Sequence, residues 1–259
     1  MNRTQAMAEL KAAGTAQNRK VYARHGIAAP MFGVSFANLG RIHKQIKTDH
    51  ALACQLWATG NHDARVLATM IADPAQVDNK LAEAWVKDLD NYVLTDAFSG
   101  MIRRGKLALR KADKWSASKH EWIGRAGWNL IAGLALYDPV IKDDYFAAYL
   151  PIIARDIHTR PNRTRDAMNS ALIAIGVRNP KLRKQAMAVA QSVGQVDVDH
   201  GETSCKTPDA AAYIHKTLAH RRAQAAKQKK RAPRAKVKVK AKAKVKAIPK
   251  AKAKAKAKR

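Results

Sequence analysis

Residues 119–136 read KHEWIGRAGWNLIAGLAL, and this stretch decides the class of fold. Its apolar residues recur every three or four positions, as they do on one face of an α-helix. Alanine, which has the highest helix propensity, is frequent. The stretch ends close to Asp138-Pro139, where proline disfavours helical geometry in the residue before it. We therefore predict a helix over residues 119–136.

The same spacing continues through residues 1–220, without the alternation and hairpin turns of strands. Pairs such as Asp73-Pro74 and Asn179-Pro180 end one helix and begin the next, because proline suits the first turn of a helix. The pattern predicts helices over residues 2–13, 17–25, 35–46, 49–58, 61–72, 78–88, 91–104, 119–136, 142–156, 162–176, 180–192 and 207–222. Short helices joined by short loops predict an all-α fold, a curved α-solenoid of stacked helical pairs, with a compact orthogonal bundle as the alternative.

Two segments interrupt the helical pattern. Residues 108–118 (ALRKADKWSAS) are expected to form a basic loop, with Trp115 as a packed anchor or pressed into a groove of nucleic acid. Residues 195–207 (QVDVDHGETSCKT) are polar and are expected to form a loop before the last helix. His200 and Cys205 share this second loop with three acidic residues, but their spacing matches no standard metal site. We expect solvated loop residues there and no metal.

The charge balance predicts a polyanionic partner. The chain has 49 Lys and Arg against 20 Asp and Glu, a formal net charge of +29. Each cation placed on a phosphate releases condensed counterions, which favours binding without reading sequence. Duplex DNA is the expected partner, and structured RNA remains open. An anionic membrane is the weaker alternative, because the basic cluster lacks the apolar face that membrane binding usually needs.

The C-terminal part of the chain is of low complexity. Residues 221–259 hold 19 of the basic residues and no acid, and lysine alternates there with alanine or valine. Repulsion between lysines and the lack of large apolar groups predict a disordered arm. We predict a helical domain over residues 1–222 and a Lys/Ala-rich DNA-binding tail over residues 223–259. The tail resembles those of linker histones and would keep the domain near DNA; a solubility or localisation tag is the alternative.

Several other classes of protein are disfavoured. The longest uncharged apolar stretch, Ala126 to Tyr137, is shorter than the roughly 20 residues that a membrane span needs. The N-terminus lacks the apolar region of a signal peptide. Cys54 and Cys205 offer no zinc pattern and are expected to be reduced thiols. We find no phosphate loop, GxSxG or HExxH motif. We expect a monomer without a cofactor, in the cytoplasm and associated with the nucleoid.

Four short segments carry a family resemblance. They are Gly33 to Leu39 followed by Arg41, Leu56-Trp57 with Asn61 to Arg65, Asp90 to Asp96, and Glu121 to Ala126. In this order and spacing they resemble the AlkD-type HEAT-like-repeat DNA glycosylases, the DNA alkylation repair family, over roughly residues 15–190. The resemblance implies a curved solenoid with a basic concave face for duplex DNA. It also implies hydrolytic excision of cationic N3- or N7-alkylated purines by a carboxylate beside aromatic residues, without a cofactor or metal.

The resemblance also suggests site residues. Asp96 holds the place of the catalytic carboxylate, and Tyr92 holds the aromatic place four residues earlier, where the family usually has Trp. Trp122 and Arg125 fit the family's W-x-x-R-A pattern, in which the Arg binds a backbone phosphate. Ser170 falls where the family has a second aromatic, so part of the aromatic cradle is absent. A carboxylate such as Asp96 could stabilise the positive charge left on the sugar and orient water.

A cluster of arginines is a further DNA-binding candidate. Arg160, Arg163 and Arg165 lie with Pro161 at a predicted helix start, and helix amino ends together with arginines favour phosphate. A plain solvated turn is the alternative for this cluster. A second basic cluster comprises Arg103, Arg104, Lys106, Arg110 and Lys111.

Three functions from different classes follow. The first is a glycosylase for alkylated purines in duplex DNA, with Asp96 as its carboxylate. The second is a non-catalytic HEAT-like scaffold that recognises bent, branched or damaged DNA, which Tyr92 and Ser170 favour. The third is a nucleoid-associated protein in which the tail dominates binding.

Overall fold

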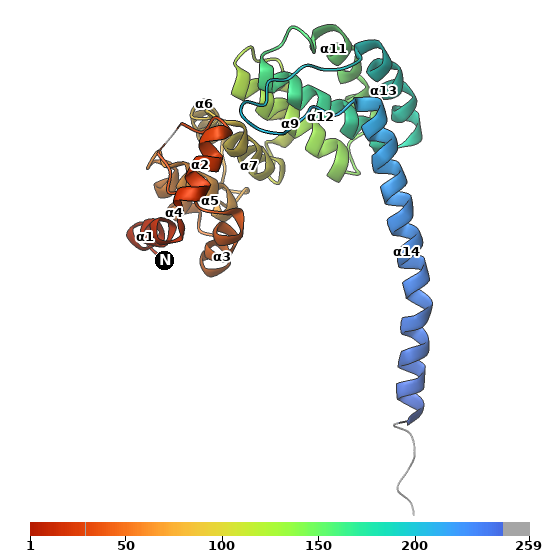
Figure 1. Cartoon of the computed structure of the whole chain (residues 1–259), viewed down its shortest axis with the longest axis horizontal. Helices are drawn as coiled ribbons and strands as arrows, with labels where there is room; N and C mark the ends of the chain where they lie inside the picture. Colours follow the sequence, from red (N-terminus) through yellow and green to blue (C-terminus); the bar gives the residue numbers. More distant parts are fainter. Residues whose placement is uncertain (29, 246–259) are drawn as a thin grey trace, which may run out of the picture. The chain divides into compact units, whose positions relative to one another are not determined.

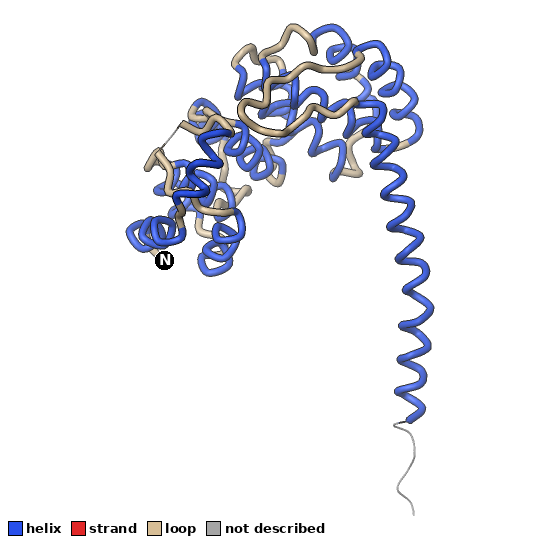
Figure 2. The backbone as a smooth tube through the Cα atoms, in the orientation of Figure 1, coloured by secondary structure: helices blue, strands red, loops and turns tan. Residues whose placement is uncertain are grey.

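The computed structural model describes residues 1–28 and 30–245, and within them the regular structure is helical (Figures 1 and 2). An isolated antiparallel bridge joins Gly14 to Val34. The helices are α1 (Arg3–Ala13), α2 (Ala16–Arg24), α3 (Phe36–Ile46), α4 (His50–Trp57), α5 (His62–Ile71), α6 (Asn79–Lys87), α7 (Tyr92–Arg103), α8 (Ala108–Ser116), α9 (Glu121–Tyr137), α10 (Asp143–Ala147), α11 (Tyr149–Asp156), α12 (Asn162–Arg178), α13 (Pro180–Val193) and α14 (Ala210–Val245).

Side-chain caps set where many of these helices begin. Asn61 precedes α5, Asp78 precedes α6 and Asn91 precedes α7, and each accepts a hydrogen bond from the backbone N–H three residues later. Such a cap satisfies one of the amide groups that a helix leaves free in its first turn. Asn179 caps α13 in the same way, followed by Pro180 at the first helical position. These starts lie within one residue of the predicted ones.

The helices of residues 1–214 pack as a row with a second layer. Helices α3, α5, α7, α9 and α12 form the row, each packed against the next. Helix α1 packs on α3, α4 on α5, α6 on α7, α8 on α9, and α11 on α12, so each helix of the row has a partner outside the row. Side chains such as Leu67, Leu94 and Leu130 are fully buried in the core between the layers. The stacked helical pairs predicted from the sequence are confirmed.

Residues 108–118 do not form the predicted loop, because residues 108–116 are helix α8. Ala108, Lys111 and Trp115 recur at helical spacing, and all three are buried against neighbouring elements. The Lys111 ammonium binds the carboxylate of Glu83, and the Trp115 indole donates to the same carboxylate at 3.2 Å. The high charge of the segment suggested a loop, but a buried ion pair holds this lysine inside.

The predicted helix over residues 142–156 is divided into α10 and α11 at Ala148. Pro151 explains the break, because proline has no N–H to donate to the carbonyl of Ala147 and its ring crowds that carbonyl.

The described chain divides into two units, Met1–Ile214 and the residues from His215 onward. Helix α14 begins in the first unit and extends to Val245, although the composition predicts a disordered arm from residue 223. Alanine and lysine both favour helices, which opposes the repulsion between lysines. The predicted boundary at residue 222 stays a prediction, and residues 246–259 lie outside the described residues. Within the described part, none of the helices combines the length and the apolar character of a membrane span.

Candidate nucleic-acid interface

The predicted site residues gather at the amino ends of three neighbouring helices of the row. Tyr92 and Asp96 lie in the first two turns of α7, Arg125 lies in the second turn of α9, and Arg163 lies at the start of α12. Because α7 packs on α9 and α9 packs on α12, residues far apart in the sequence meet at this edge. Gly124 allows the close approach of α9 to α12, since a Cβ there would lie 2.9 Å from the Thr164 hydroxyl.

Asp96 is held by three hydrogen bonds. Nε of Arg125 donates to Oδ1 at 2.9 Å, and Nη2 of the same guanidinium donates to Oδ2 at 3.1 Å. The amide of Asn129 donates to Oδ1 at 2.7 Å. The side chain of Asp96 nevertheless remains 47% exposed. The candidate carboxylate is therefore rigidly oriented, accessible from one side and neutralised from the other.

Arg125 is the buried centre of this network. Its Nη1 donates to Oδ2 of Asp166 at 2.7 Å and to the carbonyl of Arg163 at 3.1 Å. Burial alone would lower the pKa of this guanidinium, but the carboxylates of Asp96 and Asp166 raise it above its ordinary value. Four of the five N–H donors of an arginine are thus engaged within the protein. This geometry favours a bracing role, and the predicted phosphate contact of Arg125 stays a prediction.

The ring of Tyr92 is faced by two cations of the protein itself. The guanidinium carbon of Arg163 lies 5.0 Å from the ring centroid, and that of Arg125 lies 5.6 Å away. Both distances are within the range of cation–π attraction. The Tyr92 hydroxyl shares a hydrogen bond of 2.6 Å with Nδ1 of His25, at the end of α2. Burial, more than the neighbouring charges, raises the pKa of the Tyr92 phenol.

A cavity of about 590 Å³ opens beside these residues. Its lining comes from the end of α2, the starts of α9 and α12, and the segment before α14. The lining includes Arg24, His25, Trp122, Arg163, Asp199 and Glu202. Trp122 and Arg163 therefore line one cavity, and their predicted DNA-binding roles stay predictions. Both cations and carboxylates therefore line the cavity.

The remaining predicted residues lie differently. Arg160 donates through Nη2 to the carbonyls of Ser116 and Ser118, which ties the start of α12 to the end of α8. Arg165 has a buried Nε without a hydrogen-bond partner. Ser170, on α12, is exposed. Arg160 and Arg163 line different cavities, and DNA binding by the three arginines of the cluster stays a prediction.

Glu121 already occupies the amino end of α12. Its Oε1 accepts a hydrogen bond of 2.6 Å from the backbone N–H of Arg163, and its carbonyl accepts one of 2.9 Å from the Thr164 hydroxyl. An anion at a helix amino end is stabilised by the free N–H groups and the helix dipole. The protein therefore supplies internally the anion that we expected from DNA at this position.

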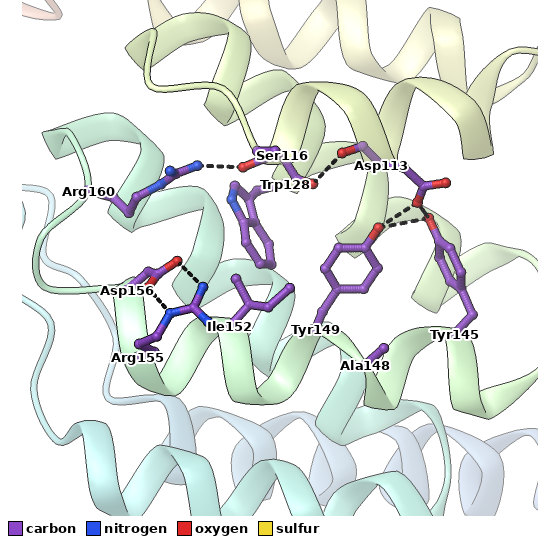
Figure 3. A pocket seen from close by; sticks show the side chains of 11 residues that line it. Asp113, Ser116, Trp128, Tyr145, Ala148, Tyr149, Ile152, Arg155, Asp156 and Arg160 are labelled. Carbon is purple, nitrogen blue, oxygen red and sulfur yellow. Dashed lines mark hydrogen bonds and ion pairs between the residues drawn. The ribbon is translucent and has the colours of Figure 1, made fainter.

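A second cavity, of about 560 Å³, lies between α8, α9 and α11 (Figure 3). Trp128 and Tyr149 line it, and the hydroxyls of Tyr145 and Tyr149 both donate to Oδ1 of Asp113, at 2.7 and 2.6 Å. Arg160 belongs to this cavity rather than to the one beside Tyr92.

The second basic cluster is largely engaged within the fold. Lys111 is 1% exposed and pairs with Glu83, and Arg110 donates to the side-chain oxygen of Asn79. Arg104 donates to the carbonyl of Thr69, and Arg103 stacks on the ring of Tyr137 at 4.7 Å. These contacts favour structural roles over the predicted DNA contact.

Several residues of the site were not identified from the sequence. Asn129 lies one turn after Arg125, and Asp166 lies three residues after Arg163, so helical spacing could have placed both on the relevant faces. His25 and His200 come from distant segments, and no local pattern indicates them. Among the described residues, no group of three or more His, Cys, Asp and Glu side chains is arranged to hold a metal ion.

The fold and site define a helical-repeat protein with a charged edge built from paired arginines and carboxylates. A family model described as DNA alkylation repair enzyme matches residues 6–214. Because the match covers most of the chain, this protein belongs to the DNA alkylation repair enzyme family. This membership confirms the family that the four sequence segments indicated, and with it the HEAT-like helical fold.

Individual relatives agree with this assignment. A solved structure with 31% sequence identity superposes with a TM-score of 0.79, covering 85% of this chain and 95% of the other. That protein is described as one of a new family related to the HEAT-like repeat DNA glycosylases, with affinity for branched DNA structures. Uncharacterized proteins of Listeria innocua and Listeria monocytogenes are each 28% identical over 214 and 215 residues. Each match covers 80% of this chain and 93% of the relative.

Proposed function

We propose that this protein binds DNA through the amino ends of α7, α9 and α12, prefers branched or distorted DNA to an uninterrupted duplex, and retains the bases it contacts. The family and the net charge of +29 support DNA as the partner. The similar solved structure, whose protein has affinity for branched DNA, supports the preference.

Our proposal that bases are not excised depends mainly on the Tyr92 ring, which two arginines of the protein already face. A cationic alkylpurine would be held over an aromatic face, but Arg163 and Arg125 already lie 5.0 and 5.6 Å from this one. A third cation beside Arg163 would be repelled by about 3 kcal/mol for two unit charges 5 Å apart near a protein surface, whereas the charge of Arg125 is already balanced by Asp96 and Asp166. The exposed Ser170 offers no second aromatic ring to compensate.

The environment of Asp96 also disfavours base excision. A carboxylate stabilises a developing positive charge on the sugar best when no cation neutralises it. Here the guanidinium of Arg125 binds both oxygens of Asp96. The bidentate pair makes Asp96 a weaker electrostatic partner for that charge.

The test compares binding to different DNA shapes. Affinity for a four-way junction should exceed affinity for a linear duplex of the same arm sequence by roughly tenfold at equal salt concentration. Fluorescence anisotropy titrations over a salt series measure the affinity for each DNA. Equal affinity for the two DNAs would overturn the preference, and no binding to either would overturn DNA binding itself.

A pair of arginine variants locates the interface. Arg163→Ala should weaken junction binding by about tenfold and lower the salt slope by about one. Arg155→Ala removes the same charge from an exposed arginine that pairs with Asp156 and lines the other cavity, so affinity should change by less than about twofold. Equal losses in both variants would mean that overall charge, and not this edge, binds the DNA.

Excision of alkylated purines is the second candidate, because Asp96 remains 47% exposed and lies one helical turn from Tyr92. With Asp96 and Asp166 flanking Arg125, this network keeps a formal charge of −1, which could still stabilise a cationic sugar. Release of free methylated base from methylated duplex DNA is measured beside Asp96→Asn. Release by the wild type that the variant loses would establish this second function and refute our first proposal.

A further inference from the structure

The segment between α13 and α14, residues 195–207, is here called the strap. Its first part is anchored in the core, since Val196 is 2% and Val198 is 8% exposed. The side-chain amide of Gln195 donates to the carbonyl of Thr207 at 3.1 Å, which closes the strap at its base. Residues 199–206 are mostly exposed, and Asp199, Gly201 and Glu202 among them line the cavity of the candidate site.

The strap contacts the start of α12 directly. The backbone N–H of Asp199 donates to Oδ1 of Asn162, and the Asn162 amide donates to the carbonyl of Asp199, both at 2.7 Å. Nη1 of Arg163 donates to Nδ1 of His200 at 3.2 Å, and the other ring nitrogen of His200 bonds to the Thr207 hydroxyl at 2.9 Å. The arginine over Tyr92 is therefore bound by the strap.

The tip of the strap also approaches the end of α2. Gly201 has a φ of +67°, and a Cβ there would lie 3.2 Å from the carbonyl oxygen of Arg24. Asp199 and Glu202 line the same cavity as Arg24 and Arg163. The strap thus places two carboxylates in the same cavity as two arginines, at the edge where we propose that DNA binds.

Carboxylates beside arginines take the place that phosphate oxygens would take, because both are anions that accept hydrogen bonds from a guanidinium. We propose that the strap is an autoinhibitory cover whose carboxylates, Asp199 and Glu202, compete with DNA phosphates for Arg24 and Arg163. This inference rests on the proposed DNA-binding function of the same site.

The construction of the strap suits such a cover. Its contacts with α12 are two exposed hydrogen bonds between Asn162 and Asp199 and a part-buried one from Arg163 to His200. Such bonds open at low cost where water can replace the partners. The buried Val196 and Val198 hold the base in place, so opening needs movement only of the residues between Asp199 and Lys206. Binding DNA would therefore exchange the hydrogen bond from Arg163 to His200, and the nearby strap carboxylates, for phosphate–arginine contacts.

Charge variants of the full chain test the competition. The double variant Asp199→Asn with Glu202→Gln should raise affinity for a four-way junction by about fivefold at low salt. Asp199→Asn keeps the oxygen that accepts from the Gly201 N–H, so the turn is preserved. Asp197→Asn is the matched control, because Asp197 is exposed in the same strap and is absent from the cavity lining. The double variant removes two negative charges and the control removes one. Removal of two surface carboxylates away from the cavity should raise affinity by less than about twofold.

Hydrogen exchange separates a displaced strap from one that contacts DNA. The amide of Asp199, now bonded to Asn162, should exchange faster when the wild-type chain is saturated with junction DNA. Slower exchange of residues 199–206 would mean that the strap itself binds DNA and would overturn the inference. An equal rise in affinity for Asp197→Asn and the double variant would overturn it as well. Loss of junction binding by the wild type would instead refute the proposed function.

Discussion

At the residue scale, the site depends on one buried cation between two carboxylates. Arg125 is 6% exposed and joins Asp96 on α7 to Asp166 on α12. An ion pair inside a protein contributes little net stability, but removal of one member leaves an unpaired charge in a poorly solvated place. The network therefore keeps three helices in register more than it offers groups for binding.

We expect Arg125→Ala to lower the free energy of unfolding by about 3 kcal/mol, because two carboxylates lose their common partner. Asp96→Asn should cost only about 1 kcal/mol, since this side chain is half exposed and its amide oxygen still accepts a hydrogen bond. Urea unfolding of both variants measures the difference. Equal losses would contradict the central role of Arg125, because Asp96 would then contribute as much to stability.

Glu83 gives a pH-dependent prediction. Burial raises the pKa of its carboxyl, but hydrogen bonds from Lys111 and Lys114 outweigh burial and lower it to about 2, below the ordinary 4.5. A depressed pKa contributes stability above pH 4.5, and this is lost as the pH falls from 4.5 toward 2. Glu83→Gln should therefore cost about 3 kcal/mol at pH 7 and progressively less below pH 4.5.

Thermal or urea unfolding at several pH values follows this loss. Glu9→Gln is the control, because Glu9 forms only an exposed ion pair with Arg41 and should change stability by less than about 1 kcal/mol. A cost for Glu83→Gln that did not depend on pH would rule out the ion pair with Lys111 as its source.

At the scale of elements, the contact of α8 with α9 depends on Gly127. A Cβ on this residue would lie 2.1 Å from the backbone nitrogen of Ser116 and 2.4 Å from the carbonyl carbon of Trp115. Backbone atoms cannot yield as a flexible side chain would, so the two helices would have to separate. The same contact holds Trp115 in the core, where it is 1% exposed.

Gly127→Ala should therefore destabilise the protein by about 3 kcal/mol, as overpacking and a helix shift would. Gly100→Ala in α7 is the matched control, because a Cβ there meets nothing within 4 Å. That change should stabilise by about 0.5–1 kcal/mol, since alanine favours the helix. If Gly127→Ala and Gly100→Ala shifted the melting temperature in the same direction, the close approach of α8 to α9 at Gly127 would be contradicted.

At the scale of the whole molecule, charge is divided between the folded part and the C-terminal sequence. Residues 221–259 carry 19 basic residues, of which two precede residue 223, so a chain ending at residue 222 loses 17. Such charges bind phosphate without reading shape. Recognition of DNA shape must then belong to residues 1–222.

A chain ending at residue 222 should bind every DNA more weakly and with a smaller salt slope, while the ratio of junction to duplex affinity stays within about twofold of the full chain. Anisotropy titrations at several salt concentrations measure both quantities. Loss of the junction preference on truncation would assign that preference to the tail and favour the nucleoid-compaction hypothesis.

The sequence by itself determined the class of fold, because apolar spacing, proline breaks and cap residues act locally along each helix. It also indicated the family and the pair Asp96 and Arg125, since four short segments carry that resemblance. Helix α8 was missed, because the burial of Lys111 depends on a carboxylate 28 residues away. Three contacts appear only in the tertiary structure. His25 hydrogen-bonds to the Tyr92 hydroxyl, the Arg163 guanidinium lies over the Tyr92 ring, and the strap hydrogen-bonds to α12. These contacts join segments up to 67 residues apart, and their energies exist only once the helices have packed.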